Sequence, residues 1–73
     1  MSIEPDAIEV GHCYLTDQST VRRVVRVLPD QRVQYEWRAG HRTHWKSGIL
    51  SAREFALAAE RRVPCDWTIK TET

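Results

Sequence analysis

The sequence predicts a small, mainly β domain with one C-terminal helix. Polar and apolar residues alternate along two consecutive segments, residues 21–28 and 32–38, and a tight Pro29-Asp30-Gln31 turn separates them. A helix-capping pattern begins at Ser51. With 73 residues the chain has room for a single core, so we expect one domain over residues 1–73.

The first part of the chain is expected to form an arm and a strand. Residues 1–9 contain Pro5 and several acids without a regular period, which favours a loose N-terminal arm. Residues 10–16 are rich in side chains that suit a pleated surface, and the polar turn Asp17-Gln18-Ser19 follows them. We therefore predict the first strand over residues 10–16.

The central hairpin carries the clearest alternation. Every second residue from 32 to 38 is apolar, ending with Trp37, and this face is expected to point to the core. Residues 21–28 alternate Val and Arg but slip in phase once, which leaves Arg23 on the apolar face. A β-bulge in this strand would restore the phase. The expected apolar face of the hairpin comprises Val21, Val25, Val27, Val33, Tyr35 and Trp37.

Two further short strands are expected to complete the sheet. Residues 43–47 place Thr43 and Trp45 on one face, which predicts a fourth strand. Residues 65–69 could supply a fifth strand, and residues 70–73 are expected to fray.

One helix is predicted between these last two strands. Ser51 and Glu54 form a capping box, in which each side chain satisfies a backbone N–H at the helix start. Pro64 excludes the helical conformation from the residue before it, so the helix is expected over residues 52–63. Its apolar stripe consists of Ala52, Phe55, Ala56, Ala59 and Val63.

This layout, over residues 10–69, resembles the SH3-like small barrels, the architecture of KOW and Tudor-type domains. The resemblance implies a bent barrel of four or five antiparallel strands, with the helix packed on it or capping one end. The Arg22-Arg23-Val24 strand, the aromatic strand after it and the Phe55-Ala56 pair of the late helix are also similar to those of a group of short bacterial proteins. A fold of this kind implies no particular activity.

Charge is distributed unevenly and gives the leading functional hypothesis. The net formal charge is +1, yet residues 19–50 hold seven Lys or Arg and only two acids. A basic β-hairpin is typical of nucleic-acid or polyanion binding, so we predict a non-catalytic binding module. Its expected polyanion site consists of Arg22, Arg26, Arg32, Arg38, Arg42 and Lys46. The same cations could instead form a solvated face paired with Glu36 and Asp30.

The aromatic residues give an alternative hypothesis. Three tryptophans are many for so short a chain, and Trp37 is expected in the core. Trp45 and Trp67 lie near a loop and the chain end, and together with Tyr14 they could form an exposed partner surface. The alternative function is therefore a protein-interaction or homo-oligomeric module.

The cysteines and histidines predict no site of their own. Cys13 and Cys65 lack the spacing of a disulfide framework or metal motif, and we favour two buried free thiols, with one disulfide as the other possibility. His12 and Cys13 are adjacent on a strand and so point to opposite faces, which disfavours a compact metal site. No catalytic residue, cofactor or metal is predicted, and a small enzyme is the remote alternative.

Location is predicted from the chain start and its hydropathy. The first residues are acidic where a signal peptide would be basic, and no apolar run is long enough to cross a membrane. We therefore expect a cytoplasmic protein.

Overall fold

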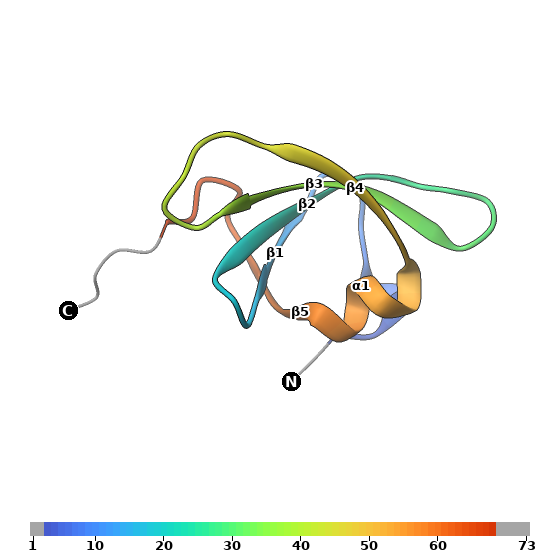
Figure 1. Cartoon of the computed structure of the whole chain (residues 1–73). Helices are drawn as coiled ribbons and strands as arrows, with labels where there is room; N and C mark the ends of the chain where they lie inside the picture. The colour runs from blue at the N-terminus through green and yellow to red at the C-terminus, as the bar shows by residue number, and fades with distance from the viewer. Residues whose placement is uncertain (1–2, 69–73) are drawn as a thin grey trace.

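The chain forms one antiparallel sheet that curves over a short helix (Figure 1). The structure is a computed structural model and describes residues 3–68. The strands are β1 (Cys13–Thr16), β2 (Thr20–Val27), β3 (Arg32–Ala39), β4 (Lys46–Ser51) and β5 (Ala59–Val63). They lie in the order β4-β3-β2-β1-β5, with β4 and β5 as edges, so the sheet is not closed within the described residues. Helix α1 (Ala52–Ala58) joins β4 to β5. The predicted mainly β class with one helix is confirmed.

The β2–β3 hairpin contains the predicted bulge. The register between the two strands shifts between Val24 and Arg26, which leaves Val25 as the extra residue. The apolar face predicted for β2 is wrong, because Val21 and Val24 are buried on opposite faces while Val25 and Val27 are 40% and 48% exposed. Both faces of the sheet are covered next to β1, so β2 needs a buried valine on each of them.

Helix α1 begins where predicted and ends earlier. The Ser51 hydroxyl accepts a hydrogen bond from the Glu54 backbone N–H at 3.1 Å, which confirms the cap. After Ala58 the chain pairs with β1 as strand β5 instead of continuing the helix to residue 63. All four residues of β1 are buried, so its second edge needs a backbone partner, and this pairing outweighs the local helical pattern.

The other two predicted strands are also displaced. The fourth strand was expected over residues 43–47, but β4 runs from Lys46 to Ser51, because it pairs with β3 from Arg32 to Trp37. Residues 65–68 form no strand, and the fifth strand is β5. The last predicted strand residue, 69, and the predicted frayed tail, 70–73, lie outside the described residues.

Residues 3–9 of the expected loose arm lie against the core, and residues 1–2 are outside the described residues. Residues 3–9 contain a 3-10 helix, η1 (Pro5–Ala7), and Ile3 and Ile8 pack against the core. No helix in the described part of the chain is long and apolar enough to span a membrane.

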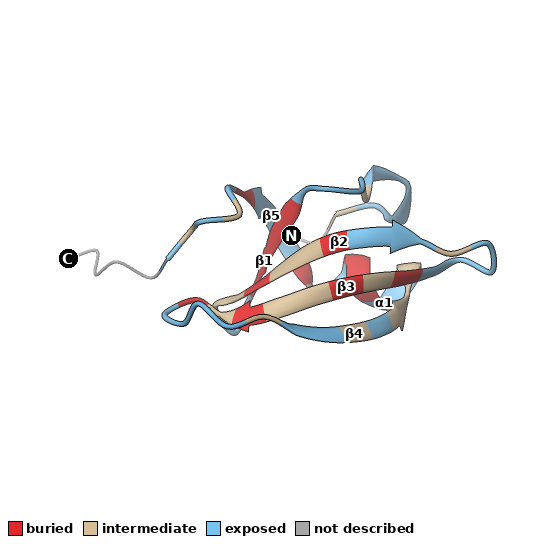
Figure 2. Cartoon of the chain, turned by 90° about the horizontal axis from the view of Figure 1, so that it is seen from above, coloured by how far each residue is buried: buried red, intermediate tan, exposed pale blue. Residues whose placement is uncertain are grey.

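The interior consists of two apolar clusters, one on each face of the sheet. Figure 2 shows their buried residues along β1, β2, β3 and α1. The helix-side core consists of Tyr14, Val24, Val33, Tyr35, Phe55 and Ala59. The disulfide-side core consists of Cys13, Leu15, Val21 and Val63, with Trp45, Cys65 and Trp67 packed against it.

Gly48 on β4 is required by the helix-side core. A Cβ atom at this position would lie 2.7 Å from the Tyr35 hydroxyl, because Tyr35 and Gly48 are cross-strand partners and the tyrosine ring lies over the glycine. A larger residue would therefore displace Tyr35.

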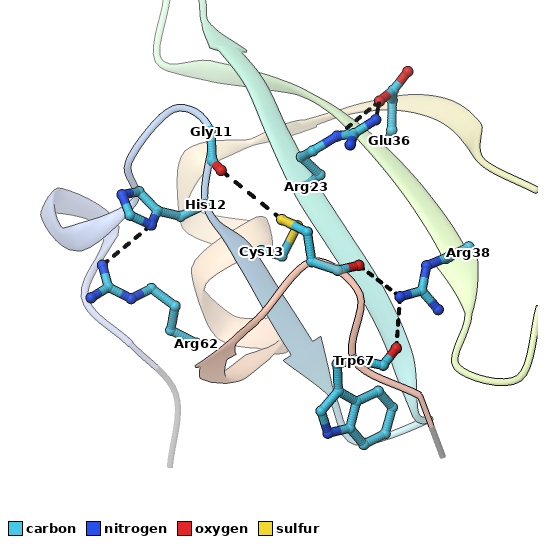
Figure 3. Close-up of a disulfide and its surroundings, with 9 residues drawn as sticks. Gly11, His12, Cys13, Arg23, Glu36, Arg38, Arg62 and Trp67 are labelled. Atoms are coloured by element: carbon cyan, nitrogen blue, oxygen red, sulfur yellow. Dashed lines mark hydrogen bonds and ion pairs between the residues drawn. A yellow bond between two sulfur atoms is a disulfide. The ribbon is translucent and has the colours of Figure 1, made fainter. Parts of the chain in front are cut away.

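Cys13 and Cys65 form a disulfide (Figure 3), so the favoured interpretation as two free thiols is wrong. Cys13 is buried on β1, and the turn after Pro64 carries Cys65 back across the same face, with a Cα–Cα distance of 5.2 Å. The two residues are 52 positions apart, so only the return of β5 to β1 brings them together.

Candidate functional site

The six cations of the predicted polyanion site do not lie on one face. Arg26, Arg32 and Arg38 lie on the face of the sheet opposite α1. Arg22 lies on the helix side, next to the ring of Tyr35. Arg42 belongs to the β3–β4 loop, and Lys46 begins β4.

The exposed arginines opposite α1 have polar neighbours. Arg32 Nε donates to Asp30 Oδ2 at 2.7 Å, and Arg26 Nη2 donates to the Gln34 side-chain oxygen at 3.1 Å. Arg23, on the same face, forms an ion pair with Glu36. Each of these three arginines thus has a polar partner within the chain, with which a polyanion would have to compete.

Arg38 is buried, with 5% of its surface exposed. Its Nη2 donates to the backbone oxygens of Cys65 at 2.8 Å and Trp67 at 2.6 Å (Figure 3). Its Nη1 donates to the oxygens of Arg42 at 3.2 Å and Ala39 at 3.4 Å. Arg38 therefore links segments of this chain and has little surface for a ligand.

The other three predicted cations, Arg22, Arg42 and Lys46, lie near Trp37. Arg22 and Lys46 are the cross-strand neighbours of Trp37 on β2 and β4, so the three side chains form a row across one face of the sheet. Lys46 Nζ lies 5.5 Å from the centre of the Trp37 ring. A half-buried aromatic ring thus lies between two cations.

Two pockets adjoin this row, and Trp37 lines both. The larger, of about 410 Å³, is lined by Trp37, Arg38, Ala39, Arg42, His44 and Lys46. The smaller, of about 270 Å³, is lined by Gln18, Thr20, Arg22, Tyr35 and Trp37. We call the two pockets together the Trp37 site. None of the described residues that line it carries a carboxylate, so the charge of the site is positive.

Arg22 contributes a half-buried charge to the smaller pocket. Its guanidinium carbon lies 5.2 Å from the centre of the Tyr35 ring and 5.9 Å from that of Phe55. Its Nε and Nη1 atoms are buried and have no hydrogen-bond partner among residues 3–68. The aromatic rings stabilise the cation, and no carboxylate among residues 3–68 forms an ion pair with it.

The aromatic residues of the alternative hypothesis do not form an exposed set. Tyr14 is 2% exposed, and its hydroxyl donates to the Ala7 oxygen and accepts from the Glu9 N–H. Trp45 is half-buried, with the guanidinium carbon of Arg23 4.4 Å from its ring centre. Trp67 is half-buried against the disulfide-side core.

Sequence reasoning missed Trp37, Gln18 and Thr20 as site residues. Trp37 was assigned to the core, and its ring does pack against the helix-side core while also lining the pockets. The site depends on how β2, β3 and β4 pair with one another. The residue pattern of a single strand does not contain this information.

Within residues 3–68, no three His, Cys, Asp or Glu side chains gather in a way that could hold a metal ion. No protein-family model, curated protein or solved structure matches the chain. The Trp37 site itself therefore provides the evidence for a function.

Proposed function

We propose that this domain is a non-catalytic module that binds single-stranded nucleic acid at the Trp37 site. The row of Arg22, Trp37 and Lys46 carries the proposal. It combines an aromatic ring, on which a base can stack, with cations that can contact the phosphates on either side. Within the described chain, neither cation has a carboxylate partner.

The shape of the site favours a single strand over a duplex. The ring of Trp37 is half-buried and lies between two pockets, so a ligand must reach into them to stack on it. An unpaired base can do so, whereas the bases of a duplex are already stacked on one another. The larger pocket, at about 410 Å³, falls within the usual size range of small-molecule sites.

The proposal retains half of the predicted cations. Arg22, Arg42 and Lys46 line the Trp37 site and are retained as ligand-binding cations. Arg38 also lines the larger pocket, but its guanidinium donates to backbone oxygens of this chain. Arg26 and Arg32 lie on the opposite face with partners of their own. Self-association through Trp45 and Trp67 stays a prediction. We also propose the SH3-like barrel as the fold family, supported by the return of β5 to pair with β1.

Salt-dependent binding tests the electrostatic part of the proposal. Fluorescence anisotropy with a fluorescein-labelled oligothymidylate of about 12 nucleotides would be measured at several salt concentrations. The variant Arg42→Gln/Lys46→Gln is expected to bind more weakly. The plot of log affinity against log salt should also become less steep, with the magnitude of its slope reduced by about 1.4. The matched control, Arg26→Gln/Arg32→Gln, removes the same charge from the opposite face and is expected to bind like the native chain.

A substitution of Trp37 tests the stacking part. Trp37→Leu keeps an apolar side chain at this position but removes the stacking surface, and we expect binding to weaken by about 1–3 kcal/mol. Thermal unfolding of the variant shows whether the fold is retained. Equal losses in both charge variants would contradict a defined site, and no binding at low salt would remove nucleic acid as the ligand. Light scattering would then test association through Trp45 and Trp67.

A further inference from the structure

We infer that Arg38 and the Cys13–Cys65 disulfide position the pocket loop, residues 40–45, for ligand binding, so that reduction of the disulfide weakens binding at the Trp37 site. Arg38 acts here as a positioning residue. The affinity part of this inference rests on the proposed function, whereas the order of the pocket loop can be measured without a ligand.

The pocket loop supplies part of the larger pocket. Arg42 and His44 line that pocket, and residues 42–45 have no regular secondary structure. Two backbone hydrogen bonds hold the start of the loop: the Arg42 N–H donates to the Ala39 oxygen at 3.0 Å, and the Gly40 N–H donates to the oxygen of Ser19, which precedes β2, at 2.8 Å. The middle of the loop is held from outside by Arg38 Nη1, which donates to the Arg42 oxygen.

The same guanidinium also holds the C-terminal segment, residues 64–68. Its second nitrogen, Nη2, donates to the backbone oxygens of Cys65 and Trp67 (Figure 3). A guanidinium is planar and rigid, so the acceptors on one nitrogen fix the direction of the other. The position of the pocket loop therefore depends on the presence of the C-terminal segment.

The disulfide keeps the C-terminal segment in place. This segment has no strand pairing, and its covalent links to the sheet are the peptide bond from Val63 on β5 and the bond from Cys65 to Cys13 on β1. Trp45, the last residue of the pocket loop, packs against the same disulfide-side core as Cys65 and Trp67. The segment and the loop thus meet at both Arg38 and Trp45, and Figures 1 and 2 show both at the same end of the sheet.

Reduction would remove this support. Dithiothreitol gives two electrons and two protons to the disulfide: the S–S bond breaks, Cys13 and Cys65 become thiols, and the reductant forms a cyclic disulfide. Once the segment can leave, the buried guanidinium of Arg38 loses two acceptors and is driven towards water. Arg42 and His44 then become ordered only when the ligand binds. Because this ordering costs free energy, we expect affinity to weaken about three- to tenfold.

Affinity in the two redox states tests the inference. The labelled oligothymidylate would be titrated with the oxidised and the dithiothreitol-reduced chain, and with Arg38→Met in both states. We expect reduction to weaken the native chain about three- to tenfold, and Arg38→Met to be weakened already when oxidised and to change little on reduction. The variant Cys13→Ala/Cys65→Ala should bind like the reduced chain and ignore the reductant.

Hydrogen exchange provides the readout that needs no ligand. Amides of residues 40–45 are expected to exchange faster on reduction, and also in oxidised Arg38→Met, while those of α1 keep their protection. If reduction unfolds the whole chain, α1 exchanges faster as well, and oxidised Arg38→Met then decides the question.

The two proposals can fail separately. If the oxidised chain binds no oligonucleotide, the proposed function fails and exchange still tests the positioning. Unchanged exchange of the pocket loop in oxidised Arg38→Met would overturn the inference, as would equal affinity in the two redox states.

Discussion

The two faces of the sheet are stabilised in different ways. On the helix side, α1 buries Phe55 between Tyr14 and Tyr35, with ring centres 5.8 and 5.4 Å apart, so burial of large apolar surface dominates. On the opposite face the core is smaller, and no helix in the described residues covers it. A disulfide and the hydrogen bonds of Arg38 hold the C-terminal segment over it instead.

This difference follows from the length of the chain. A domain of 73 residues buries a smaller fraction of its surface than a larger domain does, so few apolar residues remain to cover both faces of the sheet. A covalent cross-link and a buried cation that is hydrogen-bonded through both terminal nitrogens can hold few residues over the second face. The stability of the helix side is therefore expected to fall when a buried side chain is shortened. The stability of the disulfide side is expected to fall when the disulfide or the hydrogen bonds of Arg38 are lost.

The largest effect is expected from Phe55→Ala. Phe55 is completely buried, and its removal leaves a cavity that α1 and the sheet cannot easily fill. We expect a loss of about 3–5 kcal/mol in the free energy of unfolding, measured by denaturant titration with circular dichroism. The control Leu57→Ala removes an apolar side chain of the same helix that is 66% exposed, and should change stability by less than about 0.5 kcal/mol. Similar losses in both variants would contradict a core centred on Phe55.

The second largest loss of stability is expected when the disulfide is reduced. The bond joins residues 52 positions apart. Its loss raises the conformational entropy of the unfolded chain. Reduction should lower the free energy of unfolding by about 2–4 kcal/mol, measured by the same titration with and without dithiothreitol. Cys13→Ala/Cys65→Ala serves as the control, because the reductant should leave its stability unchanged. A reduced chain as stable as the oxidised one would show that the disulfide side needs no cross-link.

The helix side was the more predictable face because its signals are local. The alternation that ends at Trp37 and the cap at Ser51 each depend on residues a few positions apart. The disulfide side depends on contacts between distant residues, so its main features were mispredicted. Residues 59–63 continue a helical pattern in the sequence, and only the unpaired edge of β1 makes them a strand.

The candidate site was predicted in part for the same reason. Arg22, Arg42 and Lys46 were included because the middle of the chain is basic, which composition alone reveals. Composition could not separate them from Arg32. Pairing with Asp30 was one of the two interpretations left open, and the geometry of the turn selects it for Arg32. The position of Trp37 between two cations depends on the registers of β2 and β4 against β3. The pattern of residues within one strand does not reveal these registers.

The smallest effect is expected from Ser51→Ala, and it tests whether the two faces respond independently. The Ser51 hydroxyl accepts from the Glu54 N–H at the start of α1, so its loss leaves that donor without its cap. We expect a loss of about 1 kcal/mol in the free energy of unfolding, with faster exchange of the α1 amides and unchanged exchange of the pocket loop. Ser47→Ala, at an exposed position of the same strand, is the control and should have little effect. Because α1 covers only the helix side, faster exchange in the pocket loop of Ser51→Ala would show that the two faces unfold as one unit.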